Sequence, residues 1–160
     1  MLGRRAVGSD LSADMVEASN VNLPWLARQA QAALPDFTVS QADAREVELP
    51  ESCAVVSEGY LGPNLVHSPA PDQLAKIRAE LLGLYREALA NFGRQLPEGG
   101  EVSICVPAWR VDKRWQYLGL VDELGALGYT LKRFQHARTP LLYAREDQVV
   151  GRQLLLLRKK

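Results

Sequence analysis

The sequence predicts an α/β fold with a doubly wound sheet that ends in an antiparallel hairpin. Short apolar runs alternate with amphipathic stretches along the whole chain, as they do in α/β proteins. The run 53–57 is apolar on both faces, which is typical of a strand inside a parallel sheet. The last two apolar runs are separated only by the polar residues 146–148, which favours a hairpin.

Size and composition are those of one globular domain. The chain has 160 residues, of which 47% are hydrophobic and 24% charged, so we expect residues 1–160 to form a single domain. The longest apolar run, Leu154–Leu157, is far shorter than the ~20 residues of a membrane span. No apolar segment follows the start, which argues against a secretion signal, and two cysteines cannot build a disulfide framework. We therefore expect a cytoplasmic protein without a membrane partner.

The first half of the chain predicts three strands and two helical pieces. Ser12 is a candidate N-cap for the first helix, and Pro24 is expected to start a second piece that Pro35 ends. The expected strands cover 5–8, 37–40 and 53–57, and the helical pieces cover 12–21 and 24–34.

The second half predicts two helices and four strands. A long apolar stripe from Asp72 to Phe92 indicates a helix that Gly93 closes, and the run 115–127 is interpreted as another helix, closed by Gly128. Pro107 is expected to end the strand before it. The expected strands cover 102–106, 129–134, 141–145 and 149–157.

The charge is unevenly distributed, although 19 basic residues balance 19 acidic ones. Residues 1–60 hold four Arg and nine acidic residues, a net charge of −5, and residues 61–160 hold fifteen basic and ten acidic residues, a net charge of +5. This asymmetry suggests a polyanion near the second half. Ordinary variation of the surface is the alternative.

Two acids follow predicted strand ends. A carboxylate such as Asp10, at the carboxyl end of a strand before a helix, can accept both hydroxyl protons of a ribose. Capping the helix is the alternative, but Ser12 already offers a cap. Asp43 can accept a hydrogen bond from an adenine amino group, with the Ala44 backbone as a donor, although a turn-forming Asp explains it as well.

The segment 57–63 also carries candidate chemistry. Glu58 can accept N–H bonds from an exocyclic amino group, Gly59 lets the backbone approach a substrate closely, and Tyr60 offers a flat face to a base. A turn with a solvated Glu and a half-buried Tyr is an equal alternative.

At this point the sequence resembles class I S-adenosylmethionine-dependent methyltransferases. The run 7–23 is similar to the second motif of the tRNA guanosine N2-methyltransferases that often carry a THUMP domain. Residues 42–44 with Leu49-Pro50 resemble the adenine-contacting motif of that family. Ser57-Glu58-Gly59-Tyr60 falls at its Asp/Asn-Pro-Pro-Tyr motif, without the two prolines, and residues 148–152 resemble its closing hairpin.

The resemblance implies a Rossmann-like sheet from which one central strand is missing. The glycine-rich first motif of the family, which wraps the methionine part of the cofactor, has no counterpart here. In the family the first strand lies between the strands that here end at Asp10 and Ser57. We expect the given start to be internal to a longer reading frame, or a partner to complete the sheet, because losing such a strand exposes apolar side chains worth ~1.5–3 kcal/mol each. A cooperative melt of the isolated monomer would argue against this.

The resemblance also implies the ligands. The cofactor is S-adenosyl-L-methionine, bound by Asp10, Leu11, Asp43 and Ala44, and the substrate is RNA, in particular tRNA. Glu58 would hold the target amino group, Tyr60 would stack on the base and Ser57 would help to orient them. Phosphate contacts are expected from a basic group, although any one of them can be ordinary solvated surface. This group consists of Arg110, Lys113, Arg114, Arg145 and Arg152.

Other functions remain open. The same scaffold serves DNA and protein methyltransferases, and a degenerate domain without activity could act in RNA binding or assembly. NAD binding is disfavoured because no Gly-x-Gly-x-x-Gly fingerprint is present. Trp109 and Trp115 are interpreted as core residues. His67 and His136 lack partners at metal-ligand spacing, so we expect no metal site.

Overall fold

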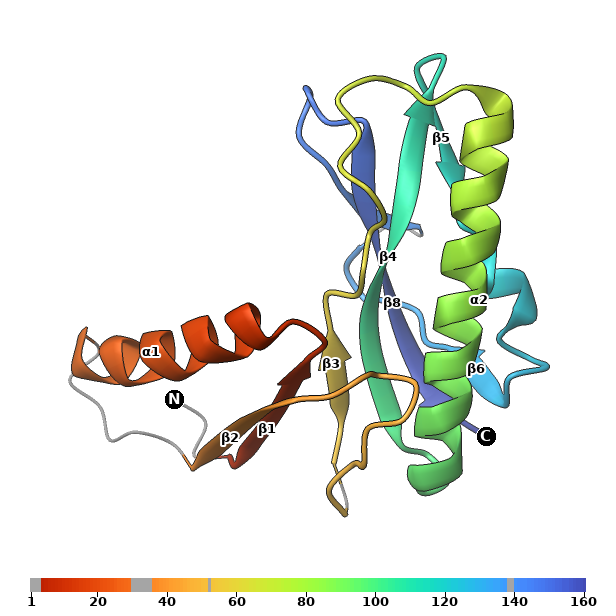
Figure 1. The fold of residues 1–160 in the computed structure, drawn as a ribbon. Coiled ribbons are helices and arrows are strands. Elements are labelled where there is room, and N and C mark those ends of the chain that lie inside the picture. The colour runs from red at the N-terminus through yellow and green to blue at the C-terminus, as the bar shows by residue number, and fades with distance from the viewer. Residues whose placement is uncertain (1–3, 30–35, 52, 138–139) are drawn as a thin grey trace. The chain divides into compact units, whose positions relative to one another are not determined.

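The computed structural model describes residues 4–29, 36–51, 53–137 and 140–160. The chain divides into two compact units, Met1–Pro50 and Glu51–Lys160. Each unit has a sheet of its own, two-stranded in the first and six-stranded in the second (Figure 1).

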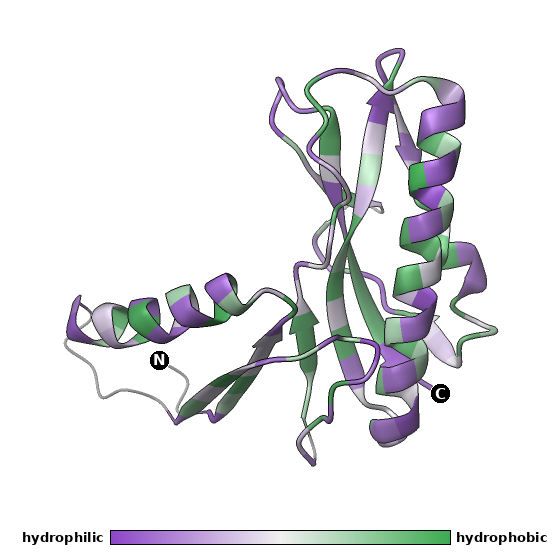
Figure 2. Cartoon of the chain, viewed as in Figure 1, coloured by the Kyte–Doolittle hydropathy of each residue, from purple (hydrophilic) through white to green (hydrophobic). Residues whose placement is uncertain are grey.

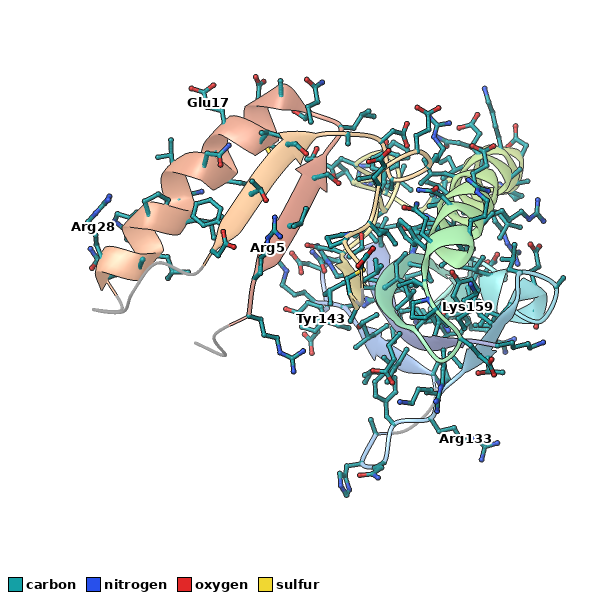
Figure 3. All side chains as sticks on the ribbon, turned by 90° about the horizontal axis from the view of Figure 1, so that it is seen from below. Arg5, Glu17, Arg28, Arg133, Tyr143 and Lys159 are labelled. Atoms are coloured by element: carbon teal, nitrogen blue, oxygen red, sulfur yellow. The ribbon has the colours of Figure 1, made fainter. Side chains whose placement is uncertain are left out.

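The first unit is a β-α-β arrangement. Strand β1 (Ala6–Asp10) lies parallel to β2 (Phe37–Gln41), from the pair Ala6 and Phe37 to the pair Asp10 and Gln41. Helix α1 (Ala13–Gln29) connects them. Figure 3 shows Glu17 and Arg28 projecting from α1 away from the two strands. The strand ends that carry the two predicted acids therefore lie side by side.

The expected break in the first helix is wrong. Helix α1 is continuous and contains Pro24 in its interior. Proline removes one backbone hydrogen bond and bends a helix, but a helix can continue through it. The expected end at Leu34 and Pro35 lies outside the described residues.

The second unit packs one long helix against a mixed sheet. The strands follow the order β3-β4-β8-β6, with β5 paired to β4 and β7 paired to β8. Strand β3 is parallel to β4, and the other pairs are antiparallel. The elements are β3 (Val55–Ser57), α2 (Pro71–Gln95), β4 (Glu101–Val111), β5 (Arg114–Tyr117), the short 3₁₀ helix η1 (Leu120–Glu123), β6 (Tyr129–Leu131), β7 (Leu141–Tyr143) and β8 (Val150–Lys159).

The core of this unit lies between α2 and one face of the sheet. Paired residues share a face, and on this face Val102, Ile104, Leu155 and Leu157 are each at most 2% exposed. Tyr129 on β6 donates a hydrogen bond of 2.9 Å to the Leu89 carbonyl on α2. Figure 2 shows hydrophobic residues along β3 and much of β8. This packing fixes the carboxyl ends of β3 and β4 relative to α2.

The interpretation of 115–127 as a helix is wrong. Asp112 and Lys113 both have positive φ, 48° and 64°, as the two central residues of a tight hairpin turn do. The chain therefore folds back, and Arg114–Tyr117 forms β5 on β4. Only the 3₁₀ turn η1 and turns up to Gly128 follow.

Two expected element ends are also wrong. Strand β4 continues through Pro107, which lies between the stretch that pairs with β3, ending at Ile104, and the stretch that pairs with β5, starting at Ala108. Proline is tolerated where one edge of a strand has no ladder partner. Helix α2 likewise continues past Gly93 to Gln95, because its buried stripe extends to Leu96. The predicted C-terminal hairpin is confirmed, with Leu141 paired to Leu154.

Strand β3 differs from the interior strand that was expected. Within the described residues it pairs only with β4, and β1 pairs only with β2. Val56 on β3 is 81% exposed. No helix in the described part of the chain is long and apolar enough to cross a membrane.

Candidate functional site

The strand ends of the first unit bring Asp10 and the segment before Asp43 together. The Ala42 amide donates a 3.0 Å hydrogen bond to the Asp10 carbonyl, and the Gln41 side chain donates one of 3.0 Å to the Leu11 carbonyl. Leu11 is 66% exposed. An apolar side chain and a carboxylate are thus presented next to each other at the end of β1.

Asp10 has one carboxylate oxygen in a local hydrogen bond. Its Oδ1 accepts the Ser12 amide at 2.8 Å, which stabilises the entry into α1. Its Oδ2 has no hydrogen bond within the described residues, and the side chain is exposed. Asp10 therefore stabilises the turn before α1 with one carboxylate oxygen and leaves the other as a hydrogen-bond acceptor for a ligand.

Asp43 is held by its own neighbour. Both of its carboxylate oxygens accept hydrogen bonds from the Arg45 side chain, the shortest at 2.6 Å, and Oδ1 also accepts the Arg45 amide. The hydrogen bonds from Arg45 lower the pKa of Asp43 to about 2. An adenine amino group would have to share this carboxylate with Arg45 or displace the guanidinium.

This pairing predicts a change in acid stability. Replacing Arg45 by Gln should raise the pKa of Asp43 from about 2 towards its ordinary value of 3.8. A lowered pKa stabilises the folded state above the unfolded-state value, and that contribution disappears as the pH falls through the folded-state pKa. The variant should therefore lose less stability than the parent between pH 3.8 and about 2. NMR titration of the Asp43 carboxyl carbon measures the pKa of Asp43 in the two proteins. A pKa near 3.8 in the parent would contradict the prediction.

A cavity of about 580 Å³ lies within the first unit, between α1 and the two strands. Asp10 contributes to its wall, and Asp43 does not. The other lining residues are Gly8, Ser9, Ser19, Asn22, Leu23, Trp25, Leu26 and Val39. Asp10 ends β1 and Asp43 follows the end of the neighbouring β2, but the two acids do not line this cavity together.

In the second unit, a rigid turn follows β3. The Gly59 amide donates a 3.0 Å hydrogen bond to the Ser57 hydroxyl, and Gly59 has a φ of 72°. A Cβ at Gly59 would lie 2.5 Å from both the Cys105 carbonyl oxygen and the Tyr85 hydroxyl. Glycine is therefore required here both for backbone conformation and for close approach.

Tyr85 of α2 anchors the same turn. Its hydroxyl lies 2.9 Å from the Tyr60 carbonyl and 3.2 Å from the Cys105 carbonyl and donates to them. The residue is 1% exposed, and burial raises the pKa of its hydroxyl. The Tyr60 ring, by contrast, is exposed. The backbone of the turn is held while an aromatic face stays available.

Removing the anchor should loosen the turn. We expect Tyr85→Phe to lower the free energy of unfolding by about 1 kcal/mol, because the Tyr60 and Cys105 carbonyls lose a part-buried donor. Tyr129→Phe is the matched control, since Tyr129 is also buried and donates to a helix carbonyl. Both variants should lose stability in urea melts, but only Tyr85→Phe should shift the amide resonances of Gly59 and Tyr60. Equal shifts in both variants would contradict the anchoring role.

Glu58 is paired with one of the predicted phosphate ligands. Arg152 of β8 donates from Nε to Glu58 Oε1 at 2.6 Å. Cys105 lies near both groups, and the pKa of its thiol is raised by burial and by the charge of Glu58. The Glu58 side chain is 64% exposed and that of Arg152 29%. A carboxylate thus faces solvent directly beyond the end of β3.

The other predicted basic residues lie in the β4–β5 hairpin and in the connection between β7 and β8. Arg110 donates to the carbonyls of Arg145 and Glu146, and its guanidinium lies 5.0 Å from the ring centre of Trp115. It therefore ties the β4–β5 hairpin to the β7–β8 connection. Lys113 and Arg114 are exposed at the hairpin turn, and the Arg145 side chain is exposed in the other connection.

Three residues of the site were not predicted from the sequence. Arg45 binds the Asp43 carboxylate, Tyr85 donates to the Tyr60 carbonyl, and the Cys105 carbonyl accepts from Tyr85. The spacing of Arg45, two residues after Asp43, was the only available signal, because Tyr85 looked like part of an apolar helix stripe. Trp109 is fully buried as expected, whereas Trp115 is only half-buried. Within the described residues no group of acids, histidines and cysteines could hold a metal ion.

The comparisons with known proteins bear on the fold. No family model matches this sequence, and no curated protein matches it significantly. NSun6 from Pyrococcus horikoshii is similar over 96% of this chain and 41% of its own, at 16% identity and a TM-score of 0.61. A SAM-dependent methyltransferase from Methanosarcina mazei is similar over 98% of this chain and 82% of its own, at 9% identity and a TM-score of 0.55.

The likeness to TrmN from Thermus thermophilus covers 99% of this chain and 44% of TrmN, at 18% identity and a TM-score of 0.41, too low to bear on the fold. The chain thus spans less than half of NSun6. It has an α/β fold with a mixed sheet that matches class I methyltransferase structures, including the antiparallel strands at the C-terminus.

Proposed function

We propose that this chain is the catalytic part of an S-adenosylmethionine-dependent RNA methyltransferase that modifies an exocyclic amino group, in particular N2 of guanine in tRNA. The observation that carries the proposal is Asp10, which ends β1 beside the end of β2 and keeps one carboxylate oxygen for a ligand. The fold supports it, since the similar protein from Methanosarcina mazei is a SAM-dependent methyltransferase.

The residues of the first unit fit the ribose of the cofactor, whereas the group that would bind the adenine amino group is already paired. Asp10 Oδ2 would accept the ribose hydroxyls, and the exposed Leu11 would pack on the adenine. Asp43 and the Ala44 backbone would bind the adenine edge only after the Arg45 guanidinium has moved away from the Asp43 carboxylate. When bound, the cofactor supplies an electrophilic methyl group on a sulfonium.

The residues of the second unit would handle the acceptor. Tyr60 would stack on the base and Glu58 would accept an N–H of the amino group, so that the nitrogen lone pair is directed outward. The amino group loses one proton when it is methylated, and Glu58 can accept that proton or pass it to water. Ser57 acts through the backbone in this scheme, because its hydroxyl holds the Gly59 amide.

Transfer of a labelled methyl group tests the proposal. The 160-residue chain would be incubated with radiolabelled donor and, in separate reactions, unmodified tRNA, duplex DNA and a protein mixture. Label in tRNA that digests to N2-methylguanosine is the expected result. Label only in DNA or in protein would reassign the acceptor and leave the class of enzyme standing.

A second candidate is a domain without activity that binds RNA or supports assembly. The pairing of Asp43 with Arg45 favours it, because that carboxylate is already occupied. Titration of the chain with S-adenosylhomocysteine in a calorimeter separates the two functions. If the chain binds tRNA but gives no detectable heat with S-adenosylhomocysteine, the result would support the domain without activity.

A further inference from the structure

The pair formed by Glu58 and Arg152 assigns Arg152 a different task from that of the other basic residues. Lys113, Arg114 and Arg145 have exposed side chains that form no hydrogen bond or ion pair within the described residues. Arg152 is less exposed, at 29%, and its Nε lies 2.6 Å from the Glu58 carboxylate. A guanidinium that uses Nε in this way cannot offer the fork of Nε and a terminal nitrogen to a phosphate.

The backbone of Arg152 lies on a strand that is paired on both sides. Strand β8 lies between β4 and β7, and Arg152 pairs with Pro107 on one side and Tyr143 on the other. Along β4, Cys105 pairs with Leu154, two residues from Arg152, so that Cys105 and Arg152 share a face. Arg152 thus reaches across the Cys105 position to Glu58. The origin of its side chain is therefore fixed by ladders on both sides.

The backbone of Glu58 is fixed as well. The preceding residue is in β3, and the following Gly59 is held by the Ser57 hydroxyl and packed against the Cys105 carbonyl and the Tyr85 hydroxyl. Only the side-chain torsions of Glu58 are left free. The hydrogen bond from Arg152 to Oε1 favours one set of these torsions, and it leaves Oε2 for another donor.

We infer that Arg152 is a positioning residue, which orients the Glu58 carboxylate towards the amino group of the substrate base rather than contacting a phosphate. The inference rests on the proposed function. Without Arg152, Glu58 is still present but samples several rotamers, and misplacing a catalytic group by about 1 Å can reduce the rate substantially.

A double-mutant cycle on methyl transfer tests this. The variants are Arg152→Gln, Glu58→Gln and both together, with Arg152→Lys as the conservative replacement. We expect Arg152→Gln to lower kcat about 10-fold with KM changed less than about 2-fold, because positioning acts on the reacting geometry. In the Glu58→Gln background the same replacement should have no effect, and Arg152→Lys should recover part of the rate.

Arg145→Gln is the matched control for a phosphate contact. It should reduce the slope of log affinity for tRNA against log salt by about one, as the loss of one phosphate contact does, and its effect should add to that of Glu58→Gln. Arg152→Gln should leave this slope unchanged. A lower slope for Arg152→Gln, or an effect that adds to that of Glu58→Gln, would overturn the inference.

A measurement without substrate separates the inference from the proposed function. In the full chain, the Nε–Hε resonance of Arg152 should be visible and should shift or disappear in Glu58→Gln. If the parent transfers no methyl group, the proposed function fails, whereas an unchanged Arg152 resonance in Glu58→Gln refutes the positioning role directly. Circular dichroism of each variant checks that the fold is retained.

Discussion

Replacing Gly59 by Ala is expected to lower the stability more than the same replacement at the other glycines that the structure describes. Its φ of 72° is unfavourable for a residue with a Cβ, by ~1–2 kcal/mol. The new Cβ would also lie 2.5 Å from two oxygen atoms, the Cys105 carbonyl and the Tyr85 hydroxyl. One of these is backbone and the other is anchored, so overpacking should add ~1–3 kcal/mol.

Thermal or urea unfolding of the two proteins measures this loss. Gly128→Ala is the matched control, because Gly128 has a φ of 82° but a Cβ there would meet nothing within 4 Å. The control should lose only the conformational part, ~1–2 kcal/mol. Equal losses in the two variants would show that Gly59 is needed for its backbone conformation alone.

Replacing Asp10 by Asn is expected to have the largest effect on ligand binding. The change keeps the size of the side chain but removes the charge that would accept the ribose hydroxyls. Hydrogen bonds to charged groups contribute ~1.5–3 kcal/mol, so affinity for S-adenosylhomocysteine should fall about 10- to 150-fold. Calorimetric titration measures the difference.

Asp14→Asn provides the control for charge. Asp14 is an exposed acid in the first turn of α1, the helix that follows Asp10. Its replacement removes one negative charge without changing the end of β1. Its affinity should remain within about 2-fold of the parent value, since an exposed charge that makes no hydrogen bond to the ligand contributes little. An equal loss of affinity in both variants would mean that Asp10 acts only through its negative charge and makes no specific hydrogen bond to the ligand.

The elements that could be predicted are those whose sequence carries a local signal. The apolar stripe that begins at Leu74 predicted α2, and the polar connection 146–148 predicted the hairpin of β7 and β8. The failure at 115–127 arose because the tight turn at Asp112 and Lys113 contains no glycine, the usual sign of positive φ. Without that turn, the alternation of Trp115 and Tyr117 in β5 could not be recognised.

The candidate site could be predicted only in part, for a related reason. Asp10, Asp43 and Glu58 could be singled out because each lies at or just after the end of a predicted strand. The groups that hold them are less conspicuous, and the most distant is Arg152, which is 94 positions from Glu58 in the chain. Such a contact depends on strand order, which no local pattern reveals.

The most direct test of the account is an NMR titration of the isotope-labelled chain with S-adenosylhomocysteine. The account predicts that the amide resonances of Asp10, Leu11 and Ala44 move together with a single affinity, and that in Asp10→Asn the same movement needs about 10- to 150-fold more ligand. Resonances that stay still at saturating ligand, or that move only in other parts of the chain, would contradict the assignment of this strand end to the donor nucleoside.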